Sequence, residues 1–150
     1  MRVVIQRVRE SSLSVGGRLI SAIGPGMTIL VGVAQGDTVG DIEWLANKIS
    51  QLRIFDDNEG VMNHNIQQTG GEILAVSQFT LNASTRKGNR PSYIAAAPPD
   101  AALPLYEQFV AALSEAVGHK VQKGVFGANM QIALVNDGPV TIIIDSKIRE

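Results

Sequence analysis

A glycine pair, Gly16-Gly17, stands between the strand-like segments 12–15 and 18–23. Adjacent glycines accept positive φ angles at both positions, which is what a two-residue β-hairpin turn requires. Residues 1–9 also have the pattern of a strand, and residues 27–34 are apolar enough for a strand buried on both faces. Successive strands joined by short turns predict a sheet that is largely antiparallel.

Two later segments carry the signals of helices. Asp37 or Thr38 can cap the first helix, and the Pro98-Pro99-Asp100 segment is typical of the start of the second. The apolar residues that we expect on the inward faces are Ile42, Leu45, Ile49 and Leu52 in the first helix, and Leu103, Tyr106, Val110, Leu113 and Val117 in the second.

The remaining apolar runs, residues 73–81, 130–136 and 140–145, predict further strands. The elements then follow the order β-β-β-β-α-β-α-β-β, with about seven or eight strands. This order predicts an α+β fold, a mainly antiparallel sheet curled toward a barrel with two helices packed outside. At this length, residues 1–150 are expected to form a single domain.

Composition excludes several classes of protein. The chain has no cysteine, which rules out disulfides, thiolate metal sites and a cysteine nucleophile. No apolar run approaches the length of a membrane span, so we expect an intracellular, cytoplasmic protein without membrane contact. The net charge of −1 means that any nucleic-acid binding must come from a local patch.

Two interruptions of apolar runs are the first candidates for a functional site. Ser77, Gln78 and Thr80 place polar side chains around Phe79 within a predicted strand. Gly138-Pro139 separates the last two strands, and this pair removes a backbone donor and a side chain. We therefore expect a ligand or another chain to approach the backbone there.

The side chains near these interruptions narrow the chemistry. Ser77 and Thr80 are candidate nucleophiles, but no histidine or lysine in the same motifs can activate them. Any chemistry at this strand is better explained by positioned backbone dipoles. The histidines, His64 and His119, are isolated, and the oxygens of residues 56–60 do not follow the calcium-loop pattern, so we expect no metal and no cofactor.

A basic segment and a glycine-containing connection favour a nucleic-acid ligand. Arg86, Lys87 and Arg90 flank a glycine and can contact phosphates, although a solvated loop is the usual reading of such charges. Phe126 and Met130 lie in a segment where Gly127 leaves room for a flat ligand, and either side chain can contact a base face. Core packing is the alternative for Phe126.

Taken together, these motifs resemble the D-aminoacyl-tRNA deacylase family of bacterial type. The co-occurrence of the Ser-Gln-Phe-Thr and Asn-Asp-Gly-Pro motifs is highly specific, and only the tail from residue 146 to 150 looks idiosyncratic. The match extends through Ile5-Gln6-Arg7-Val8, Arg53-Ile54-Phe55, Glu59-Gly60-x-Met62-Asn63, Ser77-Gln78-Phe79-Thr80-Leu81, Gly88-x-Arg90-Pro91-Ser92, Phe126-x-x-x-Met130 and Asn136-Asp137-Gly138-Pro139-Val140-Thr141.

The resemblance implies a homodimer that hydrolyses the ester between a D-amino acid and the terminal adenosine of tRNA. It also implies that glycyl-tRNA, including glycine mischarged on the alanine tRNA, is a substrate. Ser77, Gln78, Phe79 and Thr80 would form the catalytic segment, while Arg86, Lys87, Arg90, Phe126 and Met130 would contact the tRNA and its terminal adenosine.

The same resemblance assigns the choice between D- and L-amino acids to Gly138-Pro139. Proline bonds are trans by default, and nothing in the neighbouring residues overturns that. The family, however, implies a cis bond and insertion of the pair into the partner subunit's pocket. Arg7 and Asn136 would support this motif. A related group of deacylases uses a trans pair and lacks the arginine, so Arg7 favours the D-specific branch.

Several mechanisms and functions remain open at this point. We prefer a substrate-assisted reaction in which backbone N–H groups near Phe79 and Thr80 polarise the ester and the ribose 2′-hydroxyl assists water. Direct attack by Thr80 is the rival mechanism. The rival functions are a trans-proline editing deacylase, a non-catalytic RNA-binding module, and an editing domain of a larger synthetase; against the last, we expect a standalone domain.

Overall fold

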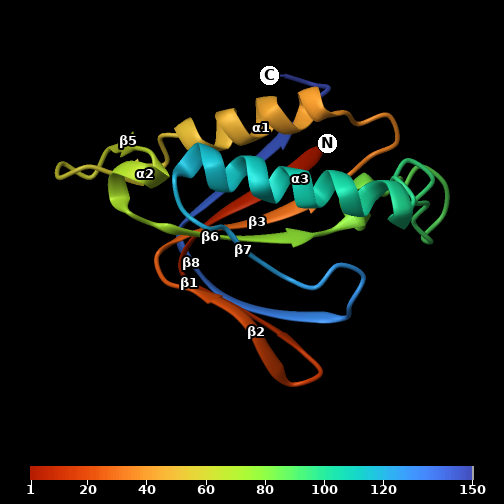
Figure 1. The fold of residues 1–150 in the computed structure, drawn as a ribbon, viewed down its shortest axis with the longest axis horizontal. Helices are drawn as coiled ribbons and strands as arrows, with labels where there is room; N and C mark the ends of the chain where they lie inside the picture. Colours follow the sequence, from red (N-terminus) through yellow and green to blue (C-terminus); the bar gives the residue numbers. More distant parts are fainter. Residues whose placement is uncertain (150) are drawn as a thin grey trace.

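The computed structural model describes residues 1–149. The first strand of the chain, β1, and the last, β8, are both long, and the helices lie between them in the sequence (Figure 1). The elements in order are β1 (Arg2–Val15), β2 (Arg18–Ile23), β3 (Gly26–Gly32), α1 (Val39–Gln51), β4 (Phe55–Asp56), β5 (Met62–His64), α2 (Ile66–Thr69), β6 (Glu72–Ser77), the 3₁₀ helix η1 (Phe79–Asn82), α3 (Pro99–Val117), β7 (Gln122–Lys123) and β8 (Met130–Asp145).

The sheet is antiparallel around β1 and parallel toward its other edge. β1 pairs antiparallel with β2 across the Gly16-Gly17 turn, as the hairpin signal predicted, and it also pairs antiparallel with β3 and β8. β6 instead pairs parallel with β3 and with β7, because α1 and α3 lie on the connections and return the chain in the same direction. The predicted curled sheet with helices outside is confirmed, and the two parallel pairs are the feature that the sequence did not indicate.

Helices α1 and α3 cover one face of the sheet and form the main core with it (Figure 1). Ile42, Leu45 and Ile49 of α1 are buried there, as predicted. The inward placement of Leu103 was wrong, since this side chain is 40% exposed. The neighbouring Ala102 takes the inward position and is buried in the main core.

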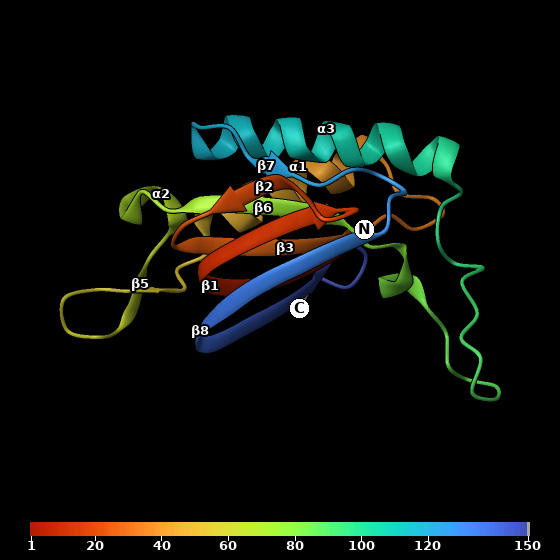
Figure 2. The same cartoon turned by 90° about the horizontal axis from the view of Figure 1, so that it is seen from below.

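The C-terminal part of β1 pairs with the N-terminal part of β8, and this paired region curls over the face of the sheet that α1 and α3 do not cover (Figure 2). A second, smaller cluster lies under this curl and includes Val8, Leu13 and Leu74. The predicted strands 130–136 and 140–145 form one bent strand rather than two. Its residues 137–140 leave the pairing with β1, because Asn136 lies opposite Val8 while Thr141 lies opposite Gln6.

Short elements account for the other differences from the sequence analysis. The helix α2 was not predicted, because four residues show no helical periodicity. Its N-cap, Asn65, accepts a hydrogen bond from the Gln68 N–H, and its C-cap Gly70 has a φ of 64°. At α1, Thr38 rather than Asp37 is the N-cap residue.

Candidate functional site

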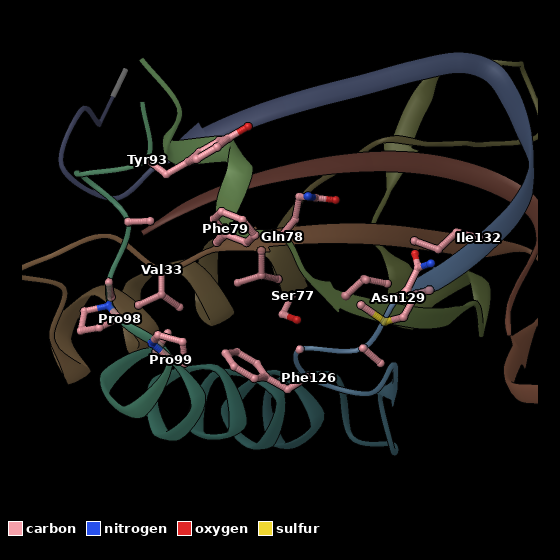
Figure 3. A pocket seen from close by; sticks show the side chains of 18 residues that line it. Val33, Ser77, Gln78, Phe79, Tyr93, Pro98, Pro99, Phe126, Asn129 and Ile132 are labelled. Atoms are coloured by element: carbon pink, nitrogen blue, oxygen red, sulfur yellow. The ribbon is translucent and has the colours of Figure 1, made fainter. Parts of the chain in front are cut away.

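A cavity of about 690 Å³ opens where β6 ends, beside the first turn of α3 (Figure 3). Its wall brings together the end of β6, the segment that precedes α3, and the connection between β7 and β8. Ser77, Gln78 and Phe79 line it, together with Phe126 and Met130. Segments about fifty residues apart in the sequence therefore meet at one site, which joins part of the catalytic candidates to Phe126 and Met130 of the nucleic-acid candidates.

Residues 78–81 are not part of a strand, which corrects the prediction. β6 ends at Ser77, and η1 begins at Phe79. The Gln78 N–H still donates to the Val31 carbonyl of β3 at 2.7 Å. The turn itself is closed by the Leu81 N–H, which donates to the Gln78 carbonyl at 3.2 Å. The polar residues that were unfavourable in a buried strand are explained by this change from strand to 3₁₀ turn.

Thr80 lies beside the cavity but is not part of its wall. Its hydroxyl accepts a hydrogen bond from the Gln78 side-chain amide at 2.5 Å. Ser77 does line the cavity, and in Figure 3 its hydroxyl points toward the space between Phe126 and Asn129. Among the described residues that line the cavity there is no acidic, basic or imidazole side chain, so the wall offers no general base for a hydroxyl nucleophile.

The backbone of η1 offers hydrogen-bond donors instead. A 3₁₀ helix leaves its first N–H groups without partners inside the helix. Within residues 1–149, the N–H groups of Phe79 and Thr80 make no hydrogen bond to another backbone group. Donors of this kind can stabilise negative charge on a carbonyl oxygen that is placed against them.

Aromatic side chains lie at the mouth and in the wall of the cavity. Phe79 and Tyr93 are 55% and 40% exposed, and their rings meet edge to face with centroids 5.1 Å apart. Phe126 lies deeper and packs against Tyr106 with centroids 5.9 Å apart. Exposed aromatic faces beside a cavity are suited to stacking a nucleobase. Tyr93 was missed from the sequence, although an aromatic residue next to a basic loop was a usable signal.

Tyr106 connects the Phe126 part of the cavity wall to β6. Its hydroxyl donates to the Ala75 carbonyl at 2.9 Å, two residues before Ser77. Burial raises the pKa of the Tyr106 hydroxyl well above its ordinary value, so the group remains a protonated donor. Because Phe126 packs against Tyr106, the hydrogen bond from Tyr106 to Ala75 also links Phe126 to the end of β6.

Gly138 and Pro139 lie outside the cavity of their own chain. Both are exposed on the excursion of residues 137–140 from β8, and the bond between them is cis, as the resemblance implied. Asn136, which precedes the excursion, is exposed and pairs with β1 opposite Val8.

Arg7 is buried in β1 and holds the base of this excursion. Its Nε–H donates to the Asp137 carbonyl at 3.0 Å. Its Nη1 donates to the Ile54 carbonyl at 2.7 Å and to Asp56 Oδ1 at 3.2 Å. Gly138 packs against the same guanidinium, because a Cβ atom on it would lie 3.1 Å from Arg7 Nη2. Arg7 thus connects β1, the segment before β4 and the excursion.

Arg86, Lys87 and Arg90 do not line the cavity. They lie in an exposed loop whose ends are joined by the paired residues Ser84 and Ser92. Figure 2 shows this loop, drawn in green, projecting from the body of the molecule. It connects η1 to Tyr93, so the positive charges extend outward from the mouth of the cavity.

Two other features bear on the function. No group of three or more metal-ligating side chains within residues 1–149 is arranged to hold a metal ion. None of the helices in this part of the chain is both long and apolar enough to cross a membrane.

Comparison with known proteins gives matches over nearly the whole chain. Residues 4–145 match the family model described as D-Tyr-tRNA(Tyr) deacylase. The D-aminoacyl-tRNA deacylases of Porphyromonas gingivalis and Parabacteroides distasonis are 61% and 57% identical to it over 150 residues, which is 100% of this chain and of each relative. A solved structure named c-Myc DNA Unwinding Element Binding Protein is 40% identical, with a TM-score of 0.90 over 97% of this chain and 98% of that one.

Proposed function

Because this chain belongs to the D-Tyr-tRNA(Tyr) deacylase family, we propose that it hydrolyses the ester bond of D-aminoacyl-tRNA and releases the free D-amino acid and tRNA. The observation that carries this proposal is the match over residues 4–145, which includes every segment that forms the cavity wall. A tRNA substrate also implies that the protein acts in the cytoplasm.

The cavity is suited to the aminoacylated end of a tRNA. Its volume of about 690 Å³ lies within the range of roughly 300–1,000 Å³ found for small-molecule sites. The aminoacyl group would enter between Ser77 and Phe126, and the terminal adenosine would stack on the aromatic side chains at the mouth. Arg86, Lys87 and Arg90 would contact the phosphates of the tRNA from their projecting loop.

In the mechanism that we propose, the N–H groups of Phe79 and Thr80 polarise the ester carbonyl. A water oxygen bonds to the carbonyl carbon, and the bond from that carbon to the ribose oxygen breaks. The water gives up a proton and the ribose oxygen gains one, with the neighbouring 2′-hydroxyl of the substrate assisting. The absence of a charged side chain from the described cavity wall supports this route over a protein base.

Thr80→Ala tests the rival mechanism, in which Thr80 attacks the ester directly. We expect this variant to keep kcat within about threefold of the parent, because loss of an essential nucleophile costs several orders of magnitude instead. Single-turnover hydrolysis of D-tyrosyl-tRNA measures this directly. A loss of more than about a thousandfold with unchanged binding would show that Thr80 is the nucleophile.

Gly32→Ala tests whether the position of η1 matters for turnover. A Cβ at this position would lie 2.9 Å from Leu81 Cβ and 3.1 Å from the Gln78 carbonyl, so η1 must shift. We expect kcat for D-tyrosyl-tRNA to fall by about ten- to a hundredfold, because small misplacements of catalytic groups have effects of this size. Gly40→Ala is the control, since its nearest contact is an ordinary 3.6 Å and it should leave kcat unchanged.

We propose that Gly138-Pro139 excludes L-amino acids by entering the cavity of a partner subunit in a homodimer. The exposure of the pair, and its place outside its own cavity, support an action on a second copy. The exposed apolar side chains Val135 and Ile143 on β8 offer a surface for that contact. Backbone atoms fixed there would clash with an L side chain yet leave room for hydrogen, which also admits glycyl-tRNA.

Hydrolysis of D-tyrosyl-tRNA compared with L-tyrosyl-tRNA by the purified chain tests the function. We expect rapid release from the D substrate only, with a homodimer in analytical ultracentrifugation. Equal rates on both substrates would contradict the selection of chirality. Binding of tRNA without hydrolysis of either substrate would instead favour a non-catalytic RNA-binding module.

A further inference from the structure

A buried carboxylate, Asp37, lies outside the cavity and has no part in the proposed chemistry. Its Oδ1 accepts a hydrogen bond from the N-terminal ammonium of Met1 at 2.5 Å, and both groups are 0% exposed. The same ammonium donates to Ser146 Oγ at 2.7 Å, while Lys147 Nζ lies 3.9 Å from Asp37 Oδ1. Asp37 therefore joins the two ends of the described chain, which both lie near α1 in Figure 1.

The second oxygen of Asp37 holds the loop that follows β3. Oδ2 accepts from the Ala34 N–H at 2.7 Å, and the Asp37 N–H donates to the Ala34 carbonyl at 3.2 Å. Both carboxylate oxygens are thus used, one for the ammonium and one for the loop. Without its charged partner, the carboxylate would be buried with an unbalanced charge, which is strongly unfavourable.

This loop is the support of one cavity wall. Ala34 pairs antiparallel with Ala96, and the Gln35 N–H donates to the Ala95 carbonyl at 2.9 Å. The Ala97 N–H donates to the Val33 carbonyl at 3.0 Å. Ala96 and Ala97 both line the cavity.

The Val33 carbonyl also accepts a hydrogen bond from η1. The Asn82 side-chain amide donates to the Val33 carbonyl at 3.0 Å, and Asn82 is the last residue of η1. Two walls of the cavity, residues 93–97 and η1, are therefore attached to the short stretch that Asp37 closes.

We propose that Asp37 is a positioning residue, whose buried ion pair with the Met1 ammonium holds residues 93–97 in the conformation that receives the aminoacyl-tRNA end. The inference rests on the proposed function for its substrate, but the anchoring itself is a property of the fold. Buried ion pairs add little net stability and are retained in some proteins because they specify one conformation, which is the role we assign here.

Asp37→Asn removes the charge and keeps an oxygen for the Ala34 N–H. We expect the KM for D-tyrosyl-tRNA to rise about tenfold while kcat changes by less than about twofold, because the wall contributes binding rather than chemistry. A purely structural role would act differently. Partial unfolding reduces the amount of active enzyme and therefore the apparent kcat, and it leaves KM unchanged.

Asp41→Asn is the matched control. Asp41 is also buried and accepts a hydrogen bond from Lys147 Nζ at 2.7 Å, but it makes no bond to Ala34. We expect this variant to lose stability without any change in KM. If Asp37→Asn does not fold, Ser146→Ala weakens the same cluster more gently and should raise KM about twofold.

Hydrogen exchange of the backbone amides measures the anchoring without any substrate. In Asp37→Asn, exchange at Gln35 and Ala97 should become at least about tenfold faster while the amides of the β1–β3 ladder keep their rates. Unchanged KM and unchanged exchange at these two amides would overturn the inference. If the parent hydrolyses no D-aminoacyl-tRNA, the proposed function fails, and the exchange rates still decide whether Asp37 anchors the wall.

Discussion

Arg7→Ala is expected to lower the free energy of unfolding by about 2–4 kcal/mol, because it leaves one buried and one partly buried carbonyl group without donors. The carbonyls of Ile54 and Asp137 both accept hydrogen bonds from this guanidinium. The excursion of residues 137–140 then loses the group that fixes its base. We therefore also expect the ratio of D- to L-tyrosyl-tRNA hydrolysis to fall by at least about tenfold, equivalent to about 1.4 kcal/mol. Urea unfolding and paired kinetics measure the two effects.

Arg9→Ala provides the matched control for this experiment. Arg9 also approaches Asp137, at 3.5 Å, but its side chain is 75% exposed. Exposed ion pairs contribute at most about 1 kcal/mol, so this variant should change neither quantity appreciably. Arg7→Lys should lie between the two, because a single ammonium cannot replace the planar fork of donors. If Arg7→Ala unfolded at the same urea concentration as Arg9→Ala, the positioning role of Arg7 would be refuted.

Gly138→Ala is expected to reduce kcat/KM for D-tyrosyl-tRNA by at least about tenfold, because the backbone conformation here costs a side-chain-bearing residue about 1–3 kcal/mol. Gly138 has a φ of 123°, and an added Cβ would lie 3.0 Å from Val140 Cγ2 and 3.1 Å from Arg7 Nη2. The excursion must shift away from the arginine to relieve both contacts. In the homodimer that we propose, the cavity of the partner subunit would then receive a displaced backbone, and hydrolysis should lose selectivity as well as speed.

A variant of a second glycine distinguishes the general cost of a side chain at a positive φ angle from the local contacts at Gly138. Gly16 also has a positive φ, 57°, but nothing lies within 4 Å of a Cβ built on it. Gly16→Ala should therefore cost some stability and leave both rate and selectivity unchanged. Steady-state kinetics on both tyrosyl-tRNA enantiomers, with thermal unfolding of each variant, provide the comparison. Equal kinetics in Gly138→Ala and the parent would remove Gly138-Pro139 from the proposed selection of chirality.

Local patterns were sufficient where one element determines its own structure. The Gly16-Gly17 turn, the buried stripe of α1 and the start of α3 follow from glycine conformations, periodicity and proline preference, and the structure has all three. The same reasoning failed for residues 78–81, which it assigned to a strand. A strand-like composition cannot show that the pairing with β3 stops once the Gln78 N–H has bonded Val31, a residue far away in the sequence, and that the Leu81 N–H then bonds the Gln78 carbonyl.

The features of the candidate site also divide into those that the sequence indicates and those that only the structure shows. The sequence by itself determined the family and singled out the polar Ser77–Thr80 segment and Gly138-Pro139 as candidates, because these depend on residue identity and short spacing. Only the tertiary structure decided that Phe126 and Met130 line one cavity with Ser77, that Tyr93 lies at the mouth and that Arg7 holds the excursion. It also revealed Asp37, whose partners are Met1 and Ala34. Contacts between distant segments depend on how the whole chain packs, and no local pattern encodes them.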